Sequence, residues 1–351
     1  METNSSNAIV DETNGTEAKN HLKEIAGKMG WRYAVFAVVV IGVQLLASGI
    51  LSALAPQWIE ANVSLFQFLL IIFSVDMIGF PLIFILSKKI LAAKLEKHNM
   101  GFGKLIVCVL IGAGICGAGM IIGNIFHFAL MLPFGVSMEE VNQLGNLMLG
   151  SDAFIRILTV GILAPIFEEL IFRKLLIDRI VKHGEFAAIL MSGLMFGLFH
   201  GNFSQFFYAT GLGLFWAFIY IKTGTIWYTI LFHMIVNLSS SVVTVYLSQS
   251  YLQAISEAGE DLTGLTQEGM LAMFIYLGWM GILIVCCIAG IILLIVNRKK
   301  FCLNANAAGM SKKEMASSAL SDKGMIVYYI PCILLFLMAY VPTIINFFTD
   351  R

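Results

Sequence analysis

The sequence has 351 residues, of which 59% are hydrophobic and only 13% are charged, and its mean hydropathy is +0.87. Soluble domains usually carry about a quarter charged residues, so this composition excludes an ordinary soluble globular protein. The 22 basic and 22 acidic residues balance to a formal net charge of zero. Nothing in that balance suggests a nucleic-acid partner or an acidic ligand. The composition predicts an integral membrane protein whose first partner is the lipid bilayer.

Long apolar runs follow one another along the chain and predict its fold. About 20 apolar residues in a helix cross the hydrocarbon core of a bilayer. Nine such runs predict an all-α, polytopic bundle of about nine spans. They cover Tyr33–Leu54, Leu65–Leu86, Lys104–Leu130, Ala153–Val181, Phe186–His200, Gln205–Ile221, Ile226–Leu247, Leu271–Val296 and Met325–Phe347. The fifth and sixth runs are short, and a single run broken by a tight turn is the alternative there.

The basic residues alternate between the predicted loops. Lys and Arg accumulate in cytoplasmic loops, and 20 of the 22 basic residues fall on one side of the nine-span arrangement. Merging the fifth and sixth spans would move Lys222 to the other side and invert every later loop. The pattern therefore favours two separate spans, a cytoplasmic N-terminus and an external C-terminus. In a bacterial host the expected location is the plasma membrane.

These boundaries divide the chain into six parts. The polar first part has the composition of a disordered segment. The parts are a cytoplasmic tail (1–32), accessory spans one to three (33–150), a core of spans four to seven (151–247) that is expected to be catalytic from the polar residues described below, an external loop with helix eight (248–297), a basic cytoplasmic linker (298–324) and helix nine (325–351).

Polar residues inside the apolar runs are the candidates for function. An ionisable group at membrane depth costs at least ~2.5 kcal/mol, so such groups persist mainly where they have a role. From the rise per residue, Glu168 lies ~20 Å, His200 ~21 Å and His233 ~15 Å from the cytoplasmic end of its own span. Three spans of alternating direction therefore bring polar groups to similar depths.

Helical spacing assigns roles to these groups. Glu169 and Arg173 are four residues apart and share a helix face, so we expect an ion pair. Glu168 lies about 100° away on the helix, which leaves it free to accept a proton as a general base. His233 and Asn237 are also four residues apart and would present two hydrogen-bond donors to one point, as an oxyanion requires.

The motifs Glu-Glu-x-x-x-Arg, Phe-x-x-x-His and His-x-x-x-Asn occur in this order at residues 168–173, 196–200 and 233–237. Together they resemble the CPBP family of intramembrane proteases, which includes the type II CAAX prenyl endopeptidases. The resemblance implies that Glu168 and His200 activate the attacking water. It implies that His233 and Asn237 stabilise the oxyanion, while Glu169 and Arg173 organise the site.

A metal-dependent mechanism is the alternative, because members of this family have also been described as metalloproteases. A catalytic zinc ion usually takes three protein ligands and a water, and Glu168, His200 and His233 could supply the three. The sequence has no His-Glu-x-x-His helix and no Asp placed to support the histidines. We therefore favour a glutamate-type mechanism without a cofactor.

The expected function is an intramembrane endopeptidase acting on a membrane-associated or lipidated peptide. The substrate could be a CAAX-type protein or the precursor of a small secreted peptide. Two other classes stay open: a non-catalytic membrane partner, such as a bacteriocin self-immunity protein, and a membrane transporter. A transporter usually shows an inverted repeat or paired broken helices, and we find neither in the sequence. The oligomeric state does not follow from the sequence.

Overall fold

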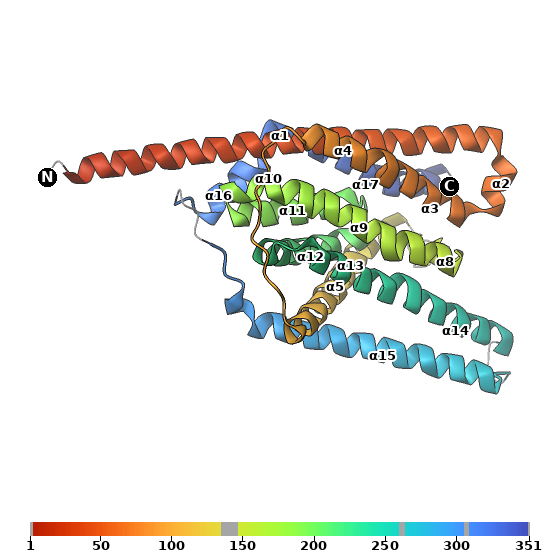
Figure 1. Ribbon diagram of the computed structural model, residues 1–351. Helices are drawn as coiled ribbons and strands as arrows, with labels where there is room; N and C mark the ends of the chain where they lie inside the picture. Colours follow the sequence, from red (N-terminus) through yellow and green to blue (C-terminus); the bar gives the residue numbers. More distant parts are fainter. Residues whose placement is uncertain (1–2, 135–146, 260–263, 305–308, 350–351) are drawn as a thin grey trace.

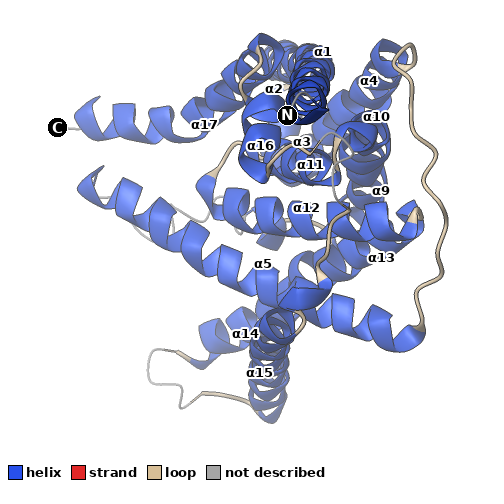
Figure 2. Cartoon of the chain, turned by 90° about the vertical axis from the view of Figure 1, so that its left-hand side faces the viewer, coloured by secondary structure: helices blue, strands red, loops and turns tan. Residues whose placement is uncertain are grey.

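The computed structural model describes residues 3–134, 147–259, 264–304 and 309–349, and every regular element in these ranges is a helix. The all-α prediction is confirmed, and Figure 2 shows helices joined by loops throughout the described chain. In Figure 1 the N-terminal helix α1 and the C-terminal helix α17 lie along one side of the bundle, and α14 and α15 lie on the opposite side.

The helices follow the predicted spans, with several spans divided into shorter segments. In chain order they are α1 (Thr3–Leu54), α2 (Pro56–Ala61), α3 (Val63–Ile71), η1 (Ile72–Gly79), α4 (Phe80–Ser87), α5 (Phe102–Met131), η2 (Leu132–Phe134), α8 (Ala153–Arg156), η3 (Ile157–Leu163), α9 (Ala164–Glu169), η4 (Leu170–Leu175), α10 (Leu176–Ile180), η5 (Val181–His183), α11 (Glu185–Phe199), α12 (Phe203–Thr223), α13 (Ile226–Asn237), η6 (Leu238–Val243), α14 (Thr244–Ala258), α15 (Gln267–Val296), η7 (Arg298–Lys300), α16 (Lys312–Leu320) and α17 (Lys323–Thr349).

Seven helices of the described chain are long and apolar enough to cross a membrane. The fourth and fifth predicted spans are not among them, although both form helices. Residues 153–183 form an unbroken succession of helical segments with charged residues inside it, and Glu185–Phe199 is a shorter apolar helix of 15 residues. These two predicted spans include four of the six motif residues, with His200 directly after the shorter helix. The count of nine spans remains a prediction.

The disorder expected for the N-terminal tail does not hold for residues 15–32, which lie in α1. Leu22, Ala26, Met29 and Tyr33 are fully buried and recur every three or four residues, as on one face of a helix. This face packs against α16 and α17. The tail is polar on average but has an apolar stripe on one helix face. Because this stripe is buried, the helix extends on the N-terminal side of the first membrane run.

The last helix packs closely against the first. A Cβ atom on Gly30 would lie 2.5 Å from the main chain of Gly324, so the two backbones approach in a way that only glycine allows. The Tyr328 hydroxyl donates to the carbonyl of Met195 at 2.8 Å, which ties α17 to α11. The segment 298–324, which we expected to be a linker, includes α16, whose start at Ser311 has a capping box with Glu314.

Helices α11 and α12 form an antiparallel hairpin that turns at residues 200–202. A Cβ atom on Gly193 would lie 2.6 Å from the side chain of Leu214, and one on Gly213 would lie 2.9 Å from Cα of Gly193. Gly201 makes the turn with φ of +67°, a conformation that favours glycine. The fifth and sixth predicted spans are therefore two separate helices, and that each crosses the membrane remains a prediction.

Candidate active site

The helix that carries Glu168 and Glu169 is irregular on both sides of them. The π-helical segments η3 and η4 flank the short helix α9. Such wide turns are uncommon and occur frequently at functional sites. They change the rotation of the helix and leave some main-chain carbonyl groups without their regular N–H donors. These carbonyls then need other donors.

Asn237 supplies the donor for one of these carbonyls. In η3 the N–H of Ala164 pairs with the carbonyl of Thr159, five residues earlier. The next N–H in this pattern would come from residue 165, which is proline and has none. The carbonyl of Val160 thus loses its regular partner, and Asn237 Nδ2 donates to it at 2.9 Å. The same amide that we expected at the oxyanion therefore also joins α13 to η3.

Two side chains bind the carbonyls of η4 in the same way. The Tyr33 hydroxyl donates to the carbonyl of Ile171, and Ser192 Oγ donates to the carbonyl of Phe172 at 2.8 Å. Helices α1 and α11 thus fix the segment that carries Arg173. The position of the site depends on helices far apart in the sequence.

The ion pair expected between Glu169 and Arg173 is present. Arg173 Nε lies 3.1 Å from Glu169 Oε2, and both side chains are fully buried. The angle is too poor for a hydrogen bond at these atoms, so the contact is ionic. The guanidinium also lies 4.3 Å from the ring centre of Phe196 and 5.6 Å from that of Trp216, where cation–π attraction stabilises it.

Glu169 also orients His233, a contact that the helical spacing did not reveal. His233 Nδ1 lies 3.0 Å from Glu169 Oε1. Because Arg173 keeps Glu169 ionised, the carboxylate accepts and Nδ1 carries the donated hydrogen. The ring of Trp216 lies 4.5 Å from the His233 ring. A carboxylate, a hydrogen bond and an indole ring therefore fix both the tautomer and the orientation of His233.

Glu168 faces the other nitrogen of the same ring. Its Oε2 lies 3.7 Å from His233 Nε2, too far for a direct hydrogen bond, and its side chain is 23% exposed, against 0% for Glu169. Two neighbouring glutamates thus lie at opposite nitrogens of one histidine. One is buried and paired with arginine, and the other is accessible.

His200 joins the site through an aromatic contact. It caps the C-terminus of α11, and its Nδ1 donates to the carbonyl of Phe196 at 2.8 Å. The Phe196 ring lies 4.8 Å from the His200 ring and 5.8 Å from the His233 ring. Since a carbonyl only accepts, the neutral His200 ring has its lone pair on Nε2.

Direct contacts thus connect four of the six predicted residues: Glu168, Glu169, Arg173 and His233. His200 is linked to them across Phe196. Asn237 contacts Val160, and the expected convergence of Asn237 and His233 on one point remains a prediction.

Asp76 is a buried carboxyl group that the motif analysis missed. It lies in η1, its exposed fraction is 6%, and it forms no hydrogen bond or ion pair with the residues that the structure describes. Segment η1 contacts α9, and the Asp76 carboxyl interacts electrostatically with Glu168. The signal was in the sequence, because Asp76 is an acidic residue inside the apolar run Leu65–Leu86.

The alternative zinc ligands Glu168, His200 and His233 do not form a metal site as placed. Each histidine uses Nδ1 in a hydrogen bond, which leaves Nε2 open, so these hydrogen bonds do not argue against a metal. Within the described ranges, no three His, Cys, Asp or Glu side chains group closely enough to hold a metal ion. The metal-free mechanism remains a prediction, and the chemistry proposed for this site uses no metal-bound step.

Comparisons with known proteins agree on the class of the central region. Residues 150–239, which include all six motif residues, match the family described as "Type II CAAX prenyl endopeptidase Rce1-like". A Bacillus subtilis (strain 168) protein named "Putative membrane peptidase YdiL" is 29% identical over 132 residues, which are 37% of this chain and 54% of that protein. The match thus spans about half of that relative's length. No solved structure matches the chain. With the apolar helices, these matches support a multi-pass membrane protein whose residues 150–239 are similar to CAAX-type membrane proteases.

Proposed function

We propose that this chain, whose residues 150–239 match a family of membrane proteases, is an intramembrane endopeptidase with Glu168 as its general base. One observation carries the proposal: Glu169 and Glu168 lie 3.0 Å and 3.7 Å from opposite nitrogens of His233. Glu169 thus orients His233, and His233 places its second nitrogen beside the accessible carboxyl group of Glu168, which is the proposed base.

In the proposed reaction, a water molecule gives a proton to Glu168 while its oxygen attacks the carbonyl carbon of the scissile peptide bond. The carbonyl oxygen becomes an oxyanion. When the carbon–nitrogen bond breaks, Glu168 returns the proton to the leaving amine. The partial exposure of Glu168 supports this role, since a base must reach water. The complete burial of Glu169 and its pairing with Arg173 support a purely organising role for that carboxylate.

Two donors are proposed for the oxyanion. The hydrogen on His233 Nδ1 goes to Glu169, so Nε2 can donate only when the ring is an imidazolium ion, the state that the proposal requires when the oxyanion forms. Asn237 gives one amide hydrogen to Val160 and keeps the second for the oxyanion. His200, with a lone pair on Nε2, would accept a hydrogen bond from the attacking water beside Glu168.

The substrate is proposed to be a membrane-associated or lipidated peptide, either a CAAX-type tail or the precursor of a small secreted peptide. A site made by helices of a membrane bundle is reached from the bilayer or from its surface. The N-terminus is proposed to be cytoplasmic and the C-terminus external, in the plasma membrane if the host is bacterial. No observation favours a transporter or a self-immunity protein.

The test compares membrane peptides from cells that lack the protein, carry it, or carry Glu168→Gln. We expect cleaved peptides with the native chain only, and the uncut precursors in the other two. The same products with Glu168→Gln would indicate a binding role instead of catalysis. The zinc content of the purified chain and its activity during chelation are measured in parallel. A stoichiometric zinc ion that is lost in both His200→Ala and His233→Ala would overturn the metal-free mechanism.

A further inference from the structure

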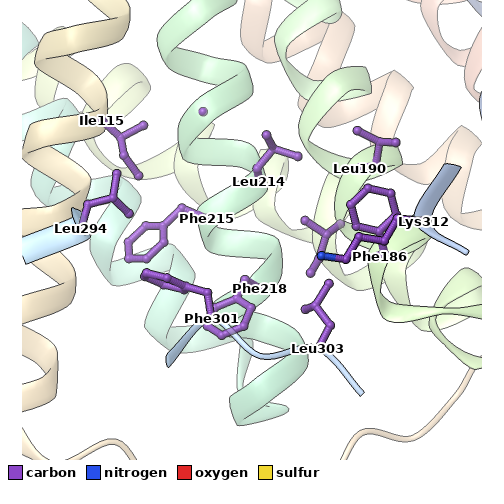
Figure 3. Close-up of a pocket in the computed structure, with 12 residues that line it drawn as sticks. Ile115, Phe186, Leu190, Leu214, Phe215, Phe218, Leu294, Phe301, Leu303 and Lys312 are labelled. Atoms are coloured by element: carbon purple, nitrogen blue, oxygen red, sulfur yellow. The ribbon is translucent and has the colours of Figure 1, made fainter. Parts of the chain in front are cut away.

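A second site, which does not include Glu168 or Glu169, lies in an apolar cavity of about 370 Å³. Helices α5, α11, α12 and α15 form its walls, and the chain after η7 closes one side (Figure 3). Four aromatic rings line it: Phe186, Phe215, Phe218 and Phe301. None of the six motif residues contributes to the cavity. Its size is within the range of ligand-binding cavities.

Lys312 is the charged residue of this lining. Figure 3 shows its amine beside Phe186 and above Leu303, directed toward the cavity, and the amine lies 5.8 Å from the Phe186 ring centre. Lys312 has no acidic partner among the residues that the structure describes. An ammonium group at the rim of an apolar cavity offers a ligand one cationic contact and a long hydrocarbon surface.

The two nearby acidic residues are engaged elsewhere. Glu185 pairs with Lys222 at 2.6 Å and accepts from Asn304 at 2.8 Å. Glu314 accepts from the main-chain N–H and hydroxyl of Ser311, and these hydrogen bonds lower the pKa of Glu314 from its ordinary value. Neither carboxylate neutralises Lys312. The adjacent η7 consists of Arg298, Lys299 and Lys300, which adds positive charge to this end of the bundle.

We propose that the cavity binds one acyl chain of an anionic phospholipid, with the lipid phosphate at Lys312. A peptide is a poor occupant, because its N–H and C=O groups would be left without partners against an apolar lining. An acyl chain has no polar groups to satisfy, and a phosphate complements the unpaired ammonium. Basic pockets between membrane helices are known to take anionic head groups. The inference does not depend on the proposed peptidase activity.

The test measures lipid retained by the purified full chain, by native mass spectrometry after reconstitution in vesicles. The vesicles contain equal amounts of phosphatidylglycerol and phosphatidylcholine with identical acyl chains. We expect the native chain to retain phosphatidylglycerol about fivefold more than phosphatidylcholine, the preference that one basic residue supplies for a net anionic head group over one whose phosphate is balanced by choline. Lys312→Gln should remove this preference. Lys313→Gln, the next residue on the same helix and not part of the lining, should keep it.

A second variant tests the cavity itself. Leu303→Trp places a larger side chain in the cavity from a loop, where the helices need not move, and should reduce retention of both lipids. Equal retention of the two lipids by the native chain would overturn the proposal, as would an unchanged preference in Lys312→Gln. Full retention in Leu303→Trp would place the lipid elsewhere. Displacement of the lipid by a farnesylated peptide, with the same strength in Lys312→Gln, would identify the cavity as a substrate site instead.

Discussion

The side-chain amide of Asn237 donates a hydrogen bond of 2.9 Å to the main-chain carbonyl of Val160, the carbonyl that Pro165 leaves without its regular donor. This relationship gives Asn237 a structural role beside the proposed catalytic one. Stability and turnover can separate the two roles, because only the structural role depends on Pro165.

We expect Asn237→Ala to lower the free energy of unfolding by about 1 kcal/mol, the net contribution of one hydrogen bond to a partly buried carbonyl. In a Pro165→Ala background the new N–H can serve Val160, so the same change should cost less. Turnover should fall about 10²–10³-fold in both backgrounds, the usual effect of one lost oxyanion donor. Thermal unfolding in detergent and peptidase assays measure the two quantities.

The control is Pro331→Ala, in α17, which should leave the stability cost of Asn237→Ala unchanged. If Asn237→Ala lowers the free energy of unfolding equally in the native chain, in Pro165→Ala and in Pro331→Ala, then Pro165 does not create the need for Asn237. Recovery of turnover together with stability would make Asn237 a structural residue alone.

Glu169 and Arg173 should contribute to folding far more than Glu168 does. Glu169→Gln and Arg173→Ala each leave a buried charge without its partner, which costs about 3–5 kcal/mol. Glu168→Gln changes the neighbouring residue, which is partly exposed and outside the ion pair, so it is the matched control and should unfold near the native temperature. Loss of stability in Glu168→Gln as large as in Glu169→Gln would refute this division of roles.

Asp76→Asn should raise the temperature of unfolding. The Asp76 carboxyl is buried and unpaired within the described chain, and a buried charge without a partner is costly. Since 1 kcal/mol shifts the midpoint by roughly 2–4 °C in a chain of 150–250 residues and by less in a longer one, a rise of about 1–2 °C is expected in differential scanning calorimetry. Gln44 of α1 donates to Oγ of Ser74, which lies in η1 like Asp76, at 3.0 Å. Gln44→Ala also changes a polar group beside η1 but removes no buried charge, so it is a control that should not raise the temperature of unfolding. A destabilised Asp76→Asn would mean that the carboxyl has a favourable partner.

The predicted topology can be tested with single cysteines in a chain from which the six native ones have been removed. Lys313→Cys should react with a membrane-impermeant thiol reagent only after the cells are opened. Gln267→Cys should react in intact cells. Both positions are exposed. The reverse pattern, or reaction of both from outside, would reject nine spans with a cytoplasmic N-terminus.

The sequence predicted the local parts of the site because helix geometry alone sets them. The pair of Glu169 and Arg173 needs only a spacing of four residues in one helix. The contact of Glu169 with His233 depends on how α9 and α13 rotate against each other. The depth of a residue along its span does not show which way its helix is rotated. The sequence therefore placed His233 at a suitable depth but did not identify its carboxylate partner.

Other features were missed although their signals were present. The stripe of Leu22, Ala26 and Met29 has helical spacing, but the polar composition of the tail outweighed it. Asp76 stood alone in an apolar run with no motif around it. The π segments η3 and η4 have no comparable sequence signal beyond Pro165, and the donors to their carbonyls come from the distant helices α1, α11 and α13.

The most direct test of the account is the rate at which purified, reconstituted Glu168→Gln hydrolyses a membrane peptide cleaved by the native chain. A lost general base typically costs 10²–10⁴-fold in rate. We predict a loss of this size in turnover, with a temperature of unfolding close to that of the native chain. A correctly folded Glu168→Gln chain that cleaves the peptide at nearly the native rate would contradict the claim that Glu168 activates the water.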